Sequence, residues 1–391
     1  MTEQVVTTPV MDTYARFPLA VVEGKGSYVW DDKGTKYLDY TSGIATCNLG
    51  HVPSVVEKKV QEQLTKLWHC SNLYHIPVQE QLAEILVQYS CGDRVFFCNS
   101  GAEANEASIK IAKKYANDKD GVEQPLIITF KNSFHGRTMA TLSATGQEKI
   151  QNGFTPLTPG FSYLPFNDMD ALEQLKKIKP AAVLFELVQG EGGVIPADKE
   201  WVQQVAAICK ENDSLLMVDE IQTGMGRTGS LFLYEQYDIE PDVISLAKGL
   251  GSGIPIGAII AKEHVAKSFS PGTHGSTFGG NPIATTAGLA TVEYLTETDI
   301  LLKAKENADY LWNQLEQLAT SSKVIKQVRG KGLLIGLEVE GQAIDFVNKA
   351  REDYQLLIVV AGPSVVRILP PLNTTKEEMN QFLHVMEQLF N

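Results

Sequence analysis

Two charged residues follow apolar runs that read as successive buried strands. Asp219 lies in LLMVDEIQTG and Lys248 in DVISLAKGLGSG. In an open parallel sheet, the carboxyl ends of the strands form the edge at which ligands bind. The spacing therefore predicts an acid and an amine that meet one ligand from two sides. The alternative is a pair of solvated charges at strand ends, and the spacing alone fits both.

An acid and an amine in this arrangement suit pyridoxal 5'-phosphate. This cofactor requires a lysine that forms a Schiff base with its aldehyde carbon and an acid that pairs with its pyridinium nitrogen. A nearby carboxylate favours the protonated ring nitrogen, because opposite charges stabilise each other. The protonated ring then withdraws electrons from a carbanion at the substrate carbon, so Asp219 and Lys248 predict this chemistry.

A phosphate site is predicted where RVFFC runs into NSGAEANEAS. The strand ends before Asn99, and Glu103 opens a long helix. Helix N-termini expose unpaired N–H groups and carry partial positive charge. We expect the amides of Gly101 and Ala102, together with the Ser100 hydroxyl, to hold a phosphate. An ordinary capping turn is the alternative interpretation.

Charge and composition exclude several classes of function. The 391 residues carry 47 Asp and Glu against 34 Lys and Arg, a formal net charge of −13. Nucleic acid is therefore not an expected partner, because phosphate binding requires dense cationic side chains. The N-terminal residues lack a basic region followed by an apolar block, and no apolar run is long enough to span a bilayer. We predict a cytoplasmic protein with no membrane partner. Five cysteines without a CxxC pattern predict neither a disulfide framework nor a metal site.

The elements that position these residues alternate between short apolar runs and longer helical patterns. Runs that are apolar on both faces suit strands covered by helices on both sides. Their order predicts an α/β fold in which a large domain, residues 51–282, has a mainly parallel central sheet. The predicted strands span residues 94–98, 125–130, 181–188, 214–220, 242–248 and 255–261.

The two ends of the chain have a different pattern. Residues 26–43 read as a hairpin around the turn Asp31–Gly34. After residue 282, a long helical stretch to about Thr320 leads into short strands and a final helix from Lys376 to Phe390. We expect residues 283–391 to form a smaller α+β domain, which the N-terminal segment 1–50 joins.

Six motifs occur in one order between about residues 20 and 371, namely NSGAEANEA, FHGRT, ELVQGEGG, VDEIQTGMGRTG, SLAKGLGSGIPIGA and STFGGNP. Together they resemble the class III, or subgroup II, aminotransferases. The resemblance implies the type I fold of pyridoxal-phosphate-dependent transferases. It also implies a homodimer with active sites at the subunit interface.

The resemblance assigns cofactor-binding roles to individual residues. Lys248 is the expected catalytic Schiff-base lysine, and Asp219 the partner of the pyridinium nitrogen. Gln222 is expected to bond the phenolic oxygen of the ring. Phe134 is expected to stack on the ring face, where an aromatic adds contact without competing for protons. Thr277 is expected to reach the phosphate of the other subunit.

The resemblance also implies substrate-binding residues. Arg137 and Arg367 are expected to bind carboxylates, since a guanidinium makes two parallel hydrogen bonds and stays charged. Glu191 is expected to pair with Arg367 when the donor carries no second carboxylate. Glu186 opens the same motif and is followed by Leu187 instead of the usual proline, which we expect to have little effect.

The nearest branch of the family acts on acetylornithine, which implies N2-acetylornithine, 2-oxoglutarate and glutamate as substrates in arginine biosynthesis. Ile44 stands where ornithine enzymes of the family have a tyrosine that contacts the free α-amino group. Isoleucine cannot make that hydrogen bond, which argues against free ornithine. Succinylornithine, succinyl-diaminopimelate, 4-aminobutyrate and ornithine remain alternative substrates. His51 and His135 are interpreted as structural.

Two other classes of function are compatible with parts of the sequence. Residues 224–229 match GxGxxG, the glycine pattern of nicotinamide dehydrogenases, but no long helix follows directly. A non-catalytic ligand-binding protein on the same fold is also compatible, because a fold does not determine a function. The presence of both Lys248 and Asp219 favours the enzyme.

Overall fold

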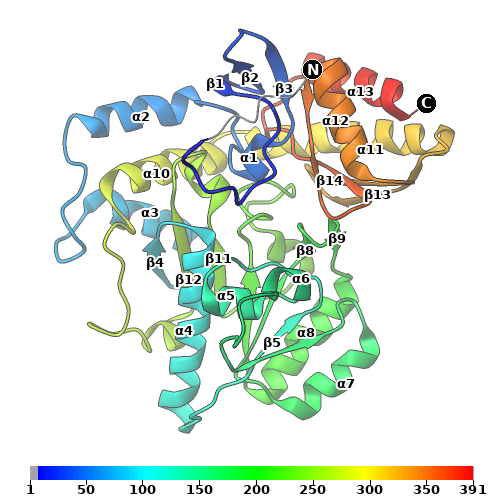
Figure 1. The fold of residues 1–391 in the computed structure, drawn as a ribbon. Coiled ribbons are helices and arrows are strands. Elements are labelled where there is room, and N and C mark those ends of the chain that lie inside the picture. Colours follow the sequence, from blue (N-terminus) through cyan, green and yellow to red (C-terminus); the bar gives the residue numbers. More distant parts are fainter. Residues whose placement is uncertain (1–7, 391) are drawn as a thin grey trace.

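The computed structural model describes residues 8–390 (Figure 1). Residues 1–7 and 391, which belong to the predicted segments 1–50 and 283–391, lie outside this description. A seven-stranded sheet forms the centre of the molecule. Its strands, in spatial order, are β4 (Arg94–Cys98), β12 (Gly257–Ala261), β11 (Val243–Leu246), β10 (Leu215–Asp219), β7 (Ala182–Glu186), β5 (Ile127–Phe130) and β6 (Phe161–Leu164).

The central sheet is mainly parallel, as predicted. Strands β11, β10, β7, β5 and β6 pair in parallel, whereas β12 runs antiparallel to both of its neighbours. The six predicted strands are present with slightly different ends. The sequence pattern did not reveal β6, because this short edge strand is only half-buried and lacks a continuous apolar run.

Strand β10 shows why an apolar strand is buried on both faces. Leu215 and Met217 pack with α4 (Gly101–Asp120), while Leu216 and Val218 pack in the cluster that contains α8 (Lys199–Asn212). Successive side chains of a strand point to opposite faces, so each helix covers one set. The remaining short helices of this part are α5 (Met139–Ala144), α6 (Glu148–Gln151), α7 (Met169–Ile178), α9 (Glu263–Ala266), η1 (Leu233–Tyr237) and η2 (Lys248–Gly251).

The predicted N-terminal hairpin is confirmed. Its strands β2 (Tyr28–Asp31) and β3 (Lys36–Asp39) flank a turn in which Asp31 Oδ1 accepts from the amide of Thr35 at 2.7 Å. β1 (Val21–Lys25) extends the sheet on one side, and β15 (Leu356–Leu357) pairs with β3 in parallel on the other. The two ends of the chain therefore share a sheet. The predicted domain boundaries stay a prediction.

The C-terminal part forms a second four-stranded sheet with helices beside it. Its strands are β13 (Ile325–Lys331), β14 (Leu334–Val339), β17 (Val365–Ile368) and β16 (Val359–Val360). The long helical stretch divides into α10 (Pro282–Glu297) and α11 (Ile300–Ser321), because Thr298 adopts an extended backbone. The final helix, α13 (Lys376–Phe390), has the predicted bounds, and α12 (Ala343–Tyr354) precedes β15.

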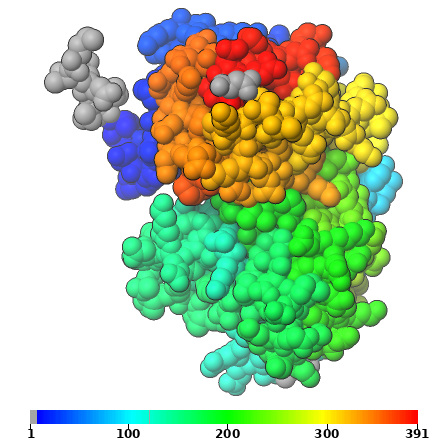
Figure 2. All heavy atoms as spheres, turned by 90° about the vertical axis from the view of Figure 1, so that its right-hand side faces the viewer, coloured from blue at the N-terminus to red at the C-terminus, as the bar shows by residue number. Residues whose placement is uncertain are grey.

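The remaining elements connect these parts. They are α1 (Ser42–Ala45), α2 (Ser54–Leu64), α3 (Pro77–Gln88), and the small hairpin β8 (Val188–Gln189) and β9 (Ile195–Pro196). Figure 2 shows the C-terminal residues gathered at one end of the molecule, with the green segments of the central sheet at the other. Between residues 8 and 390, no helix combines the length and apolar character needed to cross a membrane.

A glycine allows β12 to lie beside the turn that begins α4. Gly257 pairs with Cys98 of β4. A Cβ atom at this position would lie 2.3 Å from the Ser100 carbonyl oxygen and 2.8 Å from Cys98 Sγ. Any side chain would therefore push the turn at Ser100 away from the sheet.

We predict that Gly257→Ala lowers the free energy of unfolding by about 1–3 kcal/mol, the usual cost of overpacking a core. Urea denaturation monitored by circular dichroism measures this change. Gly275→Ala is the matched control, because no heavy atom of the described chain lies within 4 Å of its added Cβ. Equal stability of the two variants would show that the turn at Ser100 can move freely.

Candidate functional site

A cavity of about 380 Å³ lies at the carboxyl edge of the central sheet. Segments far apart in the sequence reach it from β4, β7, β10 and β11. Its lining includes most of the residues predicted from the sequence: Ser100, Gly101, Ala102, Phe134, Arg137, Glu186, Glu191, Asp219, Gln222 and Lys248. The tertiary structure therefore brings these predicted residues together in one place.

Asp219 is the buried last residue of β10. Its Oδ2 atom accepts from Asn105 Nδ2 at 2.7 Å and from His135 Nδ1 at 2.8 Å. Its Oδ1 atom accepts from the amide of Ile221 at 3.1 Å. Three donors fix the orientation of the carboxylate and compensate its removal from water. This geometry fits the structural interpretation of His135.

Lys248 follows β11 and begins η2 in a left-handed conformation, with φ +44°. This conformation is uncommon for residues other than glycine and concentrates at functional sites. Burial lowers the pKa of Lys248, although the nearby Glu191 carboxylate acts in the opposite direction. A lower pKa increases the share of neutral amine, the form that acts as a nucleophile.

The turn between β4 and α4 is held by its own side chains. Ser100 Oγ accepts from the amide of Glu103 at 3.2 Å, and Glu103 Oε2 accepts from the amide of Asn99 at 2.5 Å. The Ser100 hydroxyl can still donate a hydrogen bond. The helix thus begins at the cavity wall. Gly101 and Ala102, whose amides belong to the first turn of the helix, are lining residues of the cavity.

Phe134 and Glu186 are linked through the backbone. The amide of Phe134 donates to Glu186 Oε1 at 2.8 Å, and the amide of Gly190 donates to Oε2 at 3.3 Å. Burial, followed by the charge of Asp219, raises the pKa of Glu186 well above its usual range. Arg137 lies with its guanidinium carbon 5.6 Å from the centre of the Phe134 ring.

The two predicted arginines have different environments. Arg137 is exposed and forms no salt bridge with the acidic groups of residues 8–390. Arg367 is 1% exposed, and its Nη1 donates to Glu191 Oε1 at 2.5 Å and to the Gly190 carbonyl at 3.1 Å. It also donates to Gln222 Oε1 at 3.3 Å. The structure therefore places the predicted partners Glu191 and Arg367 in contact.

Electrostatics favour an ionised Glu191. Burial acts to raise its pKa, but the positive charge of Arg367 outweighs this effect, and the pKa of Glu191 is lowered overall. A buried arginine without a carboxylate would carry a large desolvation cost. The Glu191 carboxylate, which lines the cavity, therefore neutralises the charge of Arg367, which is buried and does not line it.

Two predicted site residues, Arg367 and Thr277, do not line the cavity; Arg367 contacts the lining residues Glu191 and Gln222, whereas Thr277 lies elsewhere. It is exposed on the segment before α10 and does not line the cavity. Asn72 Nδ2 holds this segment by donating to the carbonyls of Ser276 at 3.1 Å and Gly279 at 2.9 Å. Its predicted role at the phosphate of another subunit stays a prediction.

Sequence reasoning missed Asn105. This residue is fully buried on α4, and its side-chain amide also donates to the carbonyl of His135 at 2.8 Å. A signal existed, because Asn105 lies four residues after Gly101 and thus on the same face of α4, between buried alanines. A polar residue on the apolar face of a helix indicates a buried polar partner.

Comparison with known proteins identifies the family. The family model described as "Aminotransferase class-III" matches residues 10–390. The chain belongs to the class III aminotransferases. This aminotransferase is 60% identical to the acetylornithine aminotransferase of Oceanobacillus iheyensis, over 98% of the chain and 96% of the relative. It is 50% identical to that of Thermosynechococcus vestitus, over 97% and 94%.

Solved structures give the same result. The ornithine aminotransferase of Toxoplasma gondii matches with a TM-score of 0.94 and 32% identity, over 98% of this aminotransferase and 92% of that chain. The N-acetylornithine aminotransferase of Stenotrophomonas maltophilia matches with a TM-score of 0.84 and 36% identity, over 96% of both chains. The resemblance and the type I fold inferred from the sequence are both confirmed.

The cofactor of this aminotransferase is pyridoxal 5'-phosphate, on which its family depends. The cavity fits this molecule. A helix N-terminus suits its phosphate, and the buried carboxylate of Asp219 suits its ring nitrogen. The buried amine of Lys248 suits its aldehyde, and Phe134 offers an aromatic surface for the ring.

A second buried acid holds the turn that carries Gln222 and Thr223 to the cavity. Glu220 Oε1 accepts from the amide of Tyr234 at 2.8 Å, and Oε2 accepts from the Thr223 hydroxyl at 2.6 Å. Burial raises the pKa of Glu220 from 4.5 to about 7. Between these two pH values the unfolded chain loses this proton while the folded protein keeps it. Ionisation of Glu220 therefore makes the fold less stable as pH rises from about 4.5 to 7, and the full cost persists above 7.

We predict that Glu220→Gln gains stability relative to the original protein between pH 5 and pH 8, by about 2–3 kcal/mol, because glutamine does not titrate. Urea denaturation of both proteins without cofactor, at each pH, measures this difference. Any effect of the substitution on the free energy of unfolding that does not depend on pH cancels when the differences at pH 5 and pH 8 are subtracted. A difference that does not change with pH would show that Glu220 does not titrate in this range.

Proposed function

We propose that this aminotransferase transfers the δ-amino group of N2-acetylornithine to 2-oxoglutarate, giving N-acetylglutamate 5-semialdehyde and glutamate. The observation that carries the proposal is the pairing of Arg367 with Glu191 near the free Arg137. Such a pocket can accept substrates with one or two carboxylates. The names of the relatives from Oceanobacillus iheyensis and Thermosynechococcus vestitus support the same substrate.

Lys248 is the catalytic residue in this proposal. Its Nζ would hold the aldehyde end of the cofactor, and once free and neutral it would take a proton from the amine-bearing carbon of the substrate. The lowered pKa of Lys248 supports this role, because a proton acceptor must be neutral. Bound pyridoxal phosphate supplies an electron sink for the negative charge that develops at that carbon.

The other residues of the cavity orient the cofactor. Asp219 holds its ring nitrogen and is itself oriented by Asn105 and His135. The amides of Gly101 and Ala102 bind the phosphate with the Ser100 hydroxyl, since all three residues lie at the start of α4. Phe134 would offer its ring to that of the cofactor and Gln222 would bond its phenolic oxygen, while Glu186 holds the backbone of Phe134.

Arg137 and Arg367 divide the binding of substrates between them. Arg137 binds the carboxylate that the acetylated donor, glutamate and 2-oxoglutarate all possess, because it is exposed and free of acidic partners in the described chain. Arg367 binds the second carboxylate of glutamate or 2-oxoglutarate. With the acetylated donor, Glu191 stays on Arg367 and removes the cost of a buried unpaired charge.

Ile44 supports an acylated donor over free ornithine. It is 41% exposed within the four-residue turn α1, two residues before Thr46 of the cavity lining. Its apolar side chain cannot accept a hydrogen bond from a free α-ammonium group, which would lose hydration without compensation. Acylation removes this charge.

We predict that N2-acetylornithine converts the cofactor of the purified enzyme at least about tenfold faster than ornithine, succinyl-diaminopimelate or 4-aminobutyrate at equal concentration. Each donor is mixed with enzyme in the absence of 2-oxoglutarate, and the visible absorption spectrum is followed. Lys248→Ala controls for reactions that do not need the lysine and should show no turnover. Faster conversion by one of the other donors would contradict the proposed substrate.

The proposal includes a homodimer. Large apolar side chains lie exposed between α2 and α3 and near Thr277, namely Leu67, Trp68, Leu73, Tyr74 and Phe278. Leu73 is 89% exposed and Phe278 62% exposed. A second copy of the chain would cover such a surface, because exposed apolar clusters mark interfaces and most small assemblies are symmetric dimers. Thr277 would then lie at the boundary between two subunits, which supports its predicted role.

We predict that Leu73→Glu dissociates the dimer, because a charge would be buried at the interface. Sedimentation equilibrium measures the mass of the particle in solution. Leu302→Glu is the control, since Leu302 on α11 is 61% exposed but does not belong to this surface. A Leu73→Glu protein with the same mass as the control would argue against this interface.

A further inference from the structure

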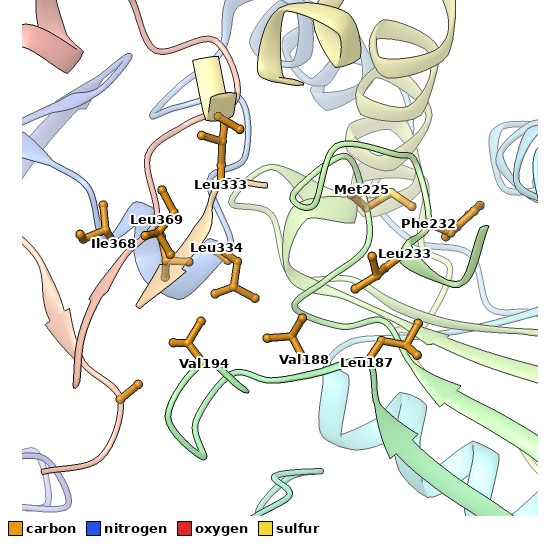
Figure 3. Packing of buried hydrophobic residues seen from close by; sticks show 14 of the residues in the cluster. Leu187, Val188, Val194, Met225, Phe232, Leu233, Leu333, Leu334, Ile368 and Leu369 are labelled. Carbon is orange, nitrogen blue, oxygen red and sulfur yellow. The ribbon is translucent and has the colours of Figure 1, made fainter. Parts of the chain in front are cut away.

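The hairpin tip that carries Glu191 is docked on the C-terminal sheet. Val194 at this tip is fully buried and has a left-handed backbone, φ +54°, which is strained for a β-branched residue. Two glycines make room for it, since a Cβ at Gly336 would lie 2.8 Å from Val194 Cβ and one at Gly330 3.1 Å from Val194 Cγ1. Figure 3 shows Val194 on this loop, facing Leu334 of β14.

Arg329 makes a second, polar contact between the sheet and the tip. Its Nε donates to the Gly193 carbonyl at 2.8 Å, and its Nη1 donates to Glu338 Oε2 at 2.5 Å. Both side chains are largely buried, with 19% of Arg329 and 31% of Glu338 exposed. Hydrogen bonds from a charged donor are the stronger kind, so Arg329 ties the backbone just after Glu191 to β13.

The backbone just before Glu191 is also held. The amide of Gly190 donates to Glu186 Oε2 at 3.3 Å, and its carbonyl accepts from Arg367 Nη1 at 3.1 Å. If the Glu191 carboxylate moved away, Arg367 would keep this carbonyl and Gln222 Oε1 as acceptors. The side chain of Glu191 is 31% exposed, so it has room to rotate.

We propose that Arg329 is a positioning residue for the choice between the two substrates. By holding the carbonyl of Gly193, Arg329 fixes the backbone near Glu191. The Glu191 side chain can then pair with Arg367 or move away from it by rotation alone, without movement of the loop. This inference rests on the proposed function, because it concerns how one pocket accepts a donor with one carboxylate and an acceptor with two.

Arg329→Met tests the inference against a control on the same strand. Lys326→Met is the control, because Lys326 also forms an ion pair, with Glu340 just after β14 at 2.6 Å, but is exposed and has no ion pair with the hairpin. In Arg329→Met the freed backbone lets Glu191 drift from Arg367, which leaves a buried unpaired charge in front of the acetylated donor. We expect kcat/KM for the acetylornithine half-reaction to fall about fivefold, mainly through KM, and that for glutamate to change less than about twofold.

Hydrogen–deuterium exchange supplies a readout that is independent of turnover. Amides in the peptide that covers residues 188–196 should exchange faster in Arg329→Met than in Lys326→Met, because local opening of the tip becomes easier. Arg329→Lys keeps the charge and should recover part of both effects. It also provides a milder variant should Arg329→Met fold poorly.

The outcomes separate this inference from the proposed function. If the unmodified enzyme does not react with acetylornithine, the proposed function fails, while the exchange comparison still tests whether Arg329 holds the tip. If it does react, and Arg329→Met slows both half-reactions equally or leaves exchange unchanged relative to Lys326→Met, the positioning role is overturned. A selective loss with faster exchange supports it.

Discussion

The charges buried at the carboxyl edge of the central sheet depend on compensation by neighbouring groups. Asp219, Glu186 and Arg367 are buried within one region of the molecule, where Lys248 is half-buried. A buried charge is tolerated only when donors, acceptors or opposite charges replace the lost hydration. Asp219 obtains three donors, and Arg367 obtains a carboxylate, a carbonyl and an amide oxygen. The arrangement of the surrounding elements can be understood from this requirement.

Each part of the chain supplies some of this compensation. The central sheet delivers Asp219 and Lys248 from adjacent strands, whereas β17 of the C-terminal sheet delivers Arg367. Arg227 connects the parts, since this fully buried residue donates to the carbonyls of Leu333 and Pro370 and to Asn48 Oδ1. Burial lowers the pKa of Arg227 to about 9. The contact of Arg367 with Glu191 and Gln222 therefore forms only when the terminal parts of the chain are packed on the central sheet.

The two arginines have different environments, and the proposed acceptance of two kinds of substrate rests on this difference. An exposed guanidinium such as that of Arg137 is hydrated by water, so leaving it without a carboxylate partner costs little free energy. The buried guanidinium of Arg367 lacks that hydration, and the carboxylate of Glu191 pairs with it instead. The loop that carries Glu191 contains both the strained backbone of Val194 and the carbonyl of Gly193 that accepts from Arg329. The C-terminal sheet therefore contributes contacts to this loop in addition to the pairing within the hairpin.

The sequence by itself determined most of the order of strands and helices, the family, and the positions of Asp219, Lys248 and the turn at Ser100 along the chain. Local periodicity, capping residues and contiguous motifs indicate those features, so they can be predicted without knowledge of the fold. It missed the half-buried edge strand β6, and it did not separate α10 from α11. Only the tertiary structure placed Asn105 and His135 on Asp219, Arg329 on Gly193, and Thr277 outside the cavity. The three hydrogen-bonded pairs, Asn105–Asp219, His135–Asp219 and Arg329–Gly193, join residues that are 84 to 136 positions apart. Their geometry depends on which strands become neighbours and how the sheets pack, and local sequence patterns do not carry that information.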